Sequence, residues 1–84
     1  MTKAKAHTFT LGGERVTLTP GQLVRAARKI EPEPVRLHGV VIEGRLFPPK
    51  QVVSAATGVD RLNFPTHEAI RVLRTLGFTP ERQT

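Results

Sequence analysis

The chain contains no cysteine, so no disulfide can hold its 84 residues together. A chain of this length forms one domain and buries only about 60–65% of the surface that its unfolded form exposes. The fold must therefore be built on one compact apolar core, with little room for a large substrate cleft. Aromatic residues are few, so Val, Leu, Ile and Ala supply most of the core, with Phe47, Phe64 and Phe78 as large anchors.

Two segments have the pattern of short β-hairpins. Residues 7–18 alternate in side-chain character on either side of Gly12-Gly13, a pair that supplies the positive φ of a tight turn. The β-branched run over 35–42 predicts a strand, and a turn at Glu43-Gly44 lets 45–47 pair back on it. A proline and a helical pattern follow each hairpin.

Three helices are expected, over residues 20–30, 51–57 and 67–76. The first begins at Thr19-Pro20, where Thr can cap free amides and Pro suits the first helical position. The proline-rich connector 31–34 stops it. Gly58 fits the left-handed residue that closes the second helix, Thr66 can cap the third, and Gly77-Phe78 match a motif that folds back onto the last turn.

These elements predict an α+β fold with two short β-hairpins and three helices, the last two in a helix-turn-helix-like arrangement. A flexible basic arm (1–6) precedes the domain (7–79), and a frayed tail (80–84) follows it. The eight residues from Pro20 match the eight from Pro49 at five positions. This similarity fits either a duplicated ββα unit or two helices that merely begin alike.

Charge is the main functional signal. Thirteen Lys and Arg face seven Asp and Glu, which gives a net charge of +6. Such an excess attracts anions, and for a small chain nucleic acid is the favoured one. The alternative is a solubility charge with no functional anion. Exposed aromatics for stacking on single strands are missing. No membrane span or signal segment is evident, so a cytoplasmic protein, possibly nucleoid-associated, is expected.

The sequence offers no catalytic centre. His7, His38 and His67 lack the i, i+4 spacing of a helical metal pair, and no cysteine completes a zinc site. Ser54 is the single serine and lies outside any nucleophile-elbow motif. We therefore expect a protein without enzymatic activity, metal or cofactor.

The order of elements from 52 to 76 is that of a helix-turn-helix, in which the second helix enters the DNA major groove. DNA contacts are expected from five residues on this helix and its connector: His67, Arg71, Arg74, Thr75 and Arg61. Arginine can donate two hydrogen bonds to guanine or contact phosphate. The connector 59–65 is longer than the usual 3–4-residue turn, so an ordinary helical hairpin with a solvated arginine face stays open.

Further basic residues could hold phosphates. Lys50 lies in the first turn of its helix, where the helix dipole disfavours a cation, so a bound anion closed over by Lys50 and Arg45 is one explanation. The other is a solvated lysine whose stem covers Phe47. Phosphate contacts are expected from Arg45, Lys50, Arg25, Arg28 and Lys29, and the arm residues Lys3 and Lys5 could add to them.

The stretch from Val41 to Phe78 resembles the small N-terminal domain of bacterial McrA-like HNH restriction endonucleases, and short actinobacterial proteins. The shared pattern is Gly44-Arg45-Leu46-Phe47-Pro48-Pro49-Lys50, Ala56-Thr57-Gly58, Phe64, and Leu73 through Leu76-Gly77-Phe78. Where the endonuclease domain often has a glycine pair, this chain has Pro65-Thr66. The resemblance implies a DNA-associated accessory domain without cleavage activity.

The sequence thus predicts a small basic module or regulator that binds nucleic acid, with double-stranded DNA favoured. The alternative is a protein-interaction module, an adaptor or inhibitor, that binds an acidic partner or forms a homodimer.

Overall fold

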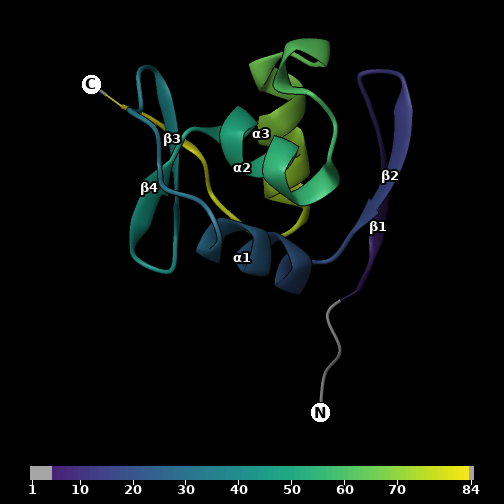
Figure 1. The fold of residues 1–84 in the computed structure, drawn as a ribbon, viewed down its shortest axis with the longest axis horizontal. Coiled ribbons are helices and arrows are strands. Elements are labelled where there is room, and N and C mark those ends of the chain that lie inside the picture. The colour runs from purple at the N-terminus through teal and green to yellow at the C-terminus, as the bar shows by residue number, and fades with distance from the viewer. Residues whose placement is uncertain (1–4, 84) are drawn as a thin grey trace.

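The computed structural model describes residues 5–83 and has the expected α+β architecture (Figure 1). Most of the basic arm, residues 1–4, lies outside the described part. The elements in order are β1 (His7–Leu11), β2 (Glu14–Leu18), α1 (Pro20–Arg28), β3 (His38–Ile42), β4 (Arg45–Phe47), α2 (Pro49–Thr57), the short 3₁₀ helix η1 (Arg61–Asn63), α3 (Thr66–Thr75) and β5 (Glu81–Arg82). The first six form two ββα units in succession.

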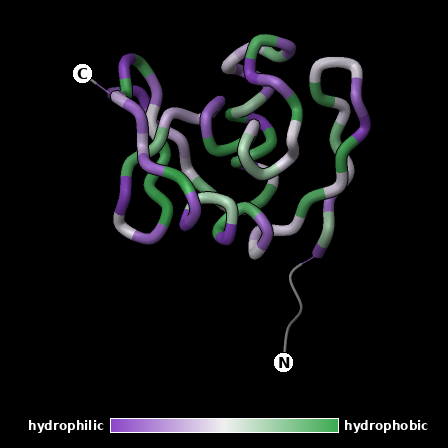
Figure 2. Tube along the Cα trace, in the orientation of Figure 1, coloured by the Kyte–Doolittle hydropathy of each residue, from purple (hydrophilic) through white to green (hydrophobic). Residues whose placement is uncertain are grey.

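Both predicted hairpins are present. β1 pairs antiparallel with β2 through a turn in which Gly12 and Gly13 have φ of 58° and 82°. β3 pairs antiparallel with β4 around Glu43 and Gly44, whose φ values are also positive. Figure 2 shows hydrophilic and hydrophobic residues mixed along the first hairpin, whereas the strands of the second hairpin carry consecutive hydrophobic residues. β3 begins at His38, three residues later than the expected start of this strand at Val35.

The C-terminal tail differs from the expected frayed end. Glu81–Arg82 form β5, which pairs antiparallel with the start of β3 and makes a three-stranded sheet in the order β4-β3-β5. The Gln83 amide then donates to the Leu37 carbonyl at 2.7 Å, and Pro80 is buried. A two-residue strand carries no periodicity of its own, so backbone pairing with β3, rather than side-chain pattern, fixes this tail.

The helix starts and ends follow local side chains. Thr19 and Gln22 form a reciprocal capping box at the start of α1. α2 and α3 lack such a cap, because prolines occupy their N-cap positions. The prediction that Thr66 caps α3 is therefore wrong, since Thr66 is the first helical residue and Pro65 is the N-cap.

The end of α3 confirms the predicted closing motif. Gly77 has φ of 97°, and its amide donates to the Arg74 carbonyl. The Phe78 amide donates to the Leu73 carbonyl at 2.9 Å, which completes a Schellman motif. The half-buried Phe78 packs against the core and so ties the end of α3 to the domain.

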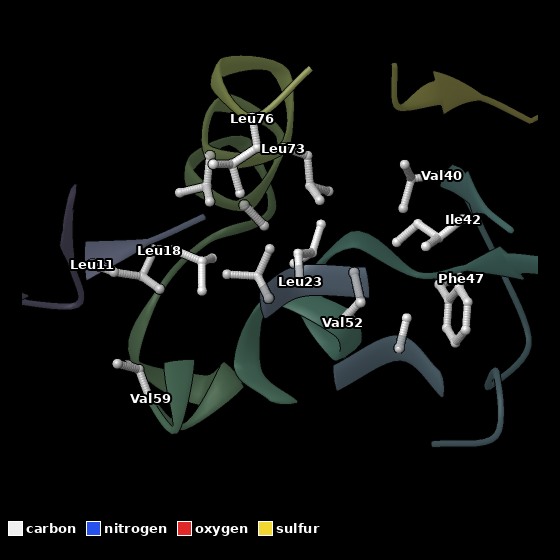
Figure 3. Close-up of a cluster of buried hydrophobic side chains, with 14 of the residues drawn as sticks. Leu11, Leu18, Leu23, Val40, Ile42, Phe47, Val52, Val59, Leu73 and Leu76 are labelled. Carbon is white, nitrogen blue, oxygen red and sulfur yellow. The ribbon is translucent and has the colours of Figure 1, made fainter. Parts of the chain in front are cut away.

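A single buried cluster joins all three helices and both sheets (Figure 3). α2 lies at its centre, with Val52 and Val53 completely buried, and it packs against both α1 and α3. α3 contributes three buried residues, Ala69, Val72 and Leu73, and its C-cap Leu76 is buried as well. Ile70, expected on the apolar stripe, is only half-buried, so the buried face of α3 is turned slightly from the expected one.

The turn between β1 and β2 yields a stability prediction. A Cβ added at Gly12 would lie 2.6 Å from the Asn63 carbonyl oxygen, whereas one at Gly13 would meet open space. Gly13→Ala should cost about 1–2 kcal/mol for its left-handed backbone alone. Gly12→Ala carries the same backbone cost and must also displace η1, which adds roughly 1–3 kcal/mol. Urea denaturation followed by far-UV circular dichroism measures both. Equal losses in the two variants would contradict the close approach of turn and η1.

Candidate nucleic-acid interface

The outward face of α3 carries the residues expected to contact DNA. His67, Arg71, Arg74 and Thr75 are all exposed, because Ala69, Val72 and Leu73 take the opposite face into the core. The Thr75 hydroxyl donates to the Arg71 carbonyl at 2.9 Å, so that hydrogen is already used. Within residues 5–83, no carboxylate forms an ion pair with Arg71 or Arg74. These two guanidinium groups are therefore available to an external anion.

A groove of about 400 Å³ runs between α3 and β1. Arg71 and Thr75 line it on the helix side, and His7, Thr8, Phe9 and Thr10 line it on the strand side. In the described part of the chain β1 pairs with β2 alone, so its other edge borders this groove. No sequence motif predicts that these strand residues lie near Arg71, because 61 or more positions separate them along the chain.

The outer face of the β1–β2 hairpin continues this surface. Thr8 lies opposite Thr17, with their hydroxyl oxygens 3.0 Å apart, and Thr10 lies opposite Arg15. All four side chains are exposed. Hydroxyl groups and arginine are common phosphate ligands. The strand register thus places Arg15 opposite Thr10, a residue that lines the groove with Arg71, which the charge count alone could not reveal.

Three of the predicted anion-binding arginines are instead held within the molecule. Arg28 makes a two-armed ion pair with Glu43, at 2.6 and 2.7 Å. Arg61 makes the same kind of pair with Glu33. Hydrogen bonds from these arginines hold the pKa of both carboxyl groups below its usual range. In both pairs the guanidinium group faces a carboxylate of the same chain.

The Arg45 side chain contacts the end of α1. Its guanidinium donates to the Ala27 carbonyl at 2.7 Å and to the Ile30 carbonyl at 3.3 Å, at the end of α1. It also lies 5.1 Å from the centre of the Phe47 ring and 3.9 Å from Glu31. A cation at a helix C-terminus donates hydrogen bonds to the last carbonyls, which have no partner within the helix, and it interacts favourably with the helix dipole. These contacts give Arg45 a role at the end of α1, and a phosphate shared by Arg45 and Lys50 stays a prediction.

The remaining predicted phosphate ligands line other grooves. Arg25 and Lys29 lie along a groove of about 340 Å³ between α1, α2 and β2. Lys50 lies in a third groove, of about 300 Å³, beside Arg36 and His38. The three grooves have no lining residue in common. Within residues 5–83 there is no cluster of three metal-ligating side chains, and no helix is long and apolar enough to cross a membrane.

The fold and this surface define a small α+β domain that presents a basic helix face beside a β-hairpin. The chain belongs to the SCO5918-like family, whose model matches residues 15–84. That match includes α3 and β2 but not β1. No curated protein and no solved structure matches the chain. The resemblance to the McrA-like endonuclease domain stays a prediction.

Replacing Arg45 tests its structural role. Arg45→Ala removes two charge-assisted hydrogen bonds at the end of α1 and should destabilise the fold by about 1–3 kcal/mol. Arg45→Lys should recover only part of this, because an ammonium cannot reproduce the two-armed geometry. Arg82→Ala, at an exposed position on β5, is the control and should change stability by less than about 0.5 kcal/mol. Urea denaturation measures all three, and an unchanged Arg45→Ala variant would refute the assignment.

The two ion pairs predict a pH dependence. The pKa of Glu33 and of Glu43 is lowered in the folded state, so their stabilisation is complete above the unfolded pKa of about 4.3. It is lost as the pH falls through the lower folded values. The melting temperature should therefore fall below about pH 4.3, and Glu33→Gln/Glu43→Gln should flatten that fall. Glu14→Gln, outside both ion pairs, should leave the profile unchanged; an equal effect would contradict the assignment.

Proposed function

We propose that this protein is a double-stranded nucleic-acid-binding module, with DNA as its ligand, and that α3 and the β1–β2 hairpin form its binding surface. The observation that carries the proposal is the distribution of charge. Arg28, Arg45 and Arg61 are consumed by internal contacts, whereas Arg71 and Arg74 project from one helix without an ion-pair partner in the described chain. Arg71 and Arg74 thus give α3 two exposed arginines on its outward face, beside the β1–β2 hairpin.

The elements around α3 support a duplex rather than a single strand. A helix fits the major groove of B-DNA, and arginines on its outer face can reach guanine edges or phosphates. The neighbouring hairpin offers Thr8, Thr10 and Arg15 at the position of a flanking backbone. Phe47 and Phe64 are buried and Phe78 is half-buried, so Phe9 is the one phenylalanine that lines the groove, and a single half-buried ring does not make the series of stacking platforms typical of single-strand binders.

Residues 58–65 connect α2 to α3, and they include η1 rather than a simple turn. Asp60 accepts a hydrogen bond from the Leu62 amide and so fixes the start of η1. In this proposal α2 supports α3 from behind, as the first helix of a helix-turn-helix does, while η1 takes up the extra length.

Salt dependence of duplex binding tests the proposal. The affinity falls as salt rises, and each lost phosphate contact makes the slope of log K against log salt less steep by roughly 0.9. Arg71→Ala/Arg74→Ala should therefore reduce the steepness by up to about 1.8 and weaken binding at every salt concentration. Because the chain has no Trp or Tyr, fluorescence anisotropy of a labelled 20-base-pair duplex is the suitable readout. Far-UV circular dichroism should show an unchanged fold, since both side chains are exposed.

The matched control removes the same charge elsewhere. Arg36→Ala/Arg82→Ala also lowers the net charge by two, at exposed positions outside the α3–β1 groove. Its affinity should fall far less than that of the α3 variant. Equal losses would mean that net charge alone attracts the duplex, and an absence of binding at low salt would end the proposal.

A further inference from the structure

The groove that contains Lys50 differs in chemistry from the α3–β1 surface. Its floor is apolar, made by Pro34, Leu37, Pro48 and Pro49. Leu37 is 49% exposed and is one of four large apolar side chains with substantial exposure among the described residues, the others being Val41, Leu46 and Leu62. Three of the four floor residues are prolines, whose fixed φ keeps the groove in shape without a bound partner. The groove is therefore a preformed apolar surface left open to solvent.

Two cationic side chains, Arg36 and Lys50, border this apolar floor. Arg36, His38 and Lys50 line the groove, and no carboxylate in residues 5–83 forms an ion pair with Arg36 or Lys50. The one acidic residue in the lining is Glu33, and both of its carboxylate oxygens accept hydrogen bonds from Arg61. The rim is therefore positive in net charge, and a ligand that complements it has an apolar group beside negative charge.

The volume of the groove limits what can enter. At about 300 Å³ it lies at the small end of ligand pockets, which typically measure roughly 300–1,000 Å³. This is room for one large apolar side chain of the kind that anchors protein interfaces. A nucleic-acid backbone would gain nothing from a floor of prolines and leucine, and no Phe lines the groove to stack on a base.

We propose that this groove docks a short acidic segment of a partner protein. One large apolar side chain of the partner enters between Leu37 and the prolines, and flanking carboxylates contact Arg36 and Lys50. The rigid floor lowers the entropic cost of binding, since the site needs no reordering. This site shares no lining residue with the α3–β1 groove, so it can exist whether or not the protein binds DNA.

A synthetic peptide tests the site on the full chain. The probe is a fluorescein-labelled nine-residue peptide with a central Phe and Asp or Glu on both sides, and anisotropy should show saturable binding below roughly 1 mM. Arg36→Ala/Lys50→Ala should weaken binding at least about tenfold, as should replacement of the central Phe of the peptide by Ala. Leu37→Ser should weaken it as well, and its fold can be checked by circular dichroism, because this half-exposed side chain lies outside the buried core.

The control is Arg71→Ala/Arg74→Ala, which removes the same charge from α3. It should change peptide affinity by less than about twofold, since the two sites are separate. Three results would overturn the proposal: no saturable binding, equal binding of the peptide without its Phe, or an equal loss in the α3 variant. The last two would show that charge alone attracts the peptide. Duplex binding is measured in parallel, so failure of either site is seen independently of the other.

Discussion

The packing of α2 against its neighbours is the constraint on which the rest of the structure depends. α2 contacts α1, α3, β2, β3 and η1, and Val52 and Val53 have no exposed surface. A helix enclosed on so many sides has little room for polar residues. Its one buried polar side chain, Gln51, donates to the Glu31 carbonyl and accepts from the Glu33 amide. The same helix therefore holds the proline-rich connector in place.

This enclosure explains why the first ββα unit and the second have different roles despite their similarity. Gln22 and Gln51 occupy equivalent positions in the matched eight-residue stretches. Gln22 is exposed and completes the capping box of α1, whereas Gln51 is buried and bonds the connector. Leu18 and Phe47, at the ends of the second strands, are both buried. The two units have the same order of elements, but equivalent residues make different contacts because the two helices differ in how far they are buried.

Local features of the fold could be predicted from the sequence, and long-range ones could not. Gly12-Gly13, Gly58 and Gly77-Phe78 act through the φ values of a few adjacent residues, so their turns and caps follow from short motifs. β5 has only two residues, and its pairing with β3 depends on the path of the whole chain. The same holds for the surface, because Arg28 meets Glu43 and Arg61 meets Glu33 only once α1, β4 and η1 are in place.

These long-range pairs determine how a net charge of +6 is distributed. Glu31, Glu33 and Glu43 lie near Arg45, Arg61 and Arg28, so carboxylates and arginines compensate each other around the connector and the second hairpin. An exposed ion pair contributes little to stability, yet it removes an arginine from the set that can meet an external anion. Among the described residues, the cations without an ion-pair partner include Arg71 and Arg74 on α3, Arg15 on the first hairpin, Arg36 and Lys50 at the Leu37 groove, Arg25 and Lys29 on the outer side of α1, and Arg82 on β5. The number of cations in so small a domain is therefore a poor guide to where an anion would bind. The better guide is the set of cations that form no contact with the protein's own carboxylates and carbonyls.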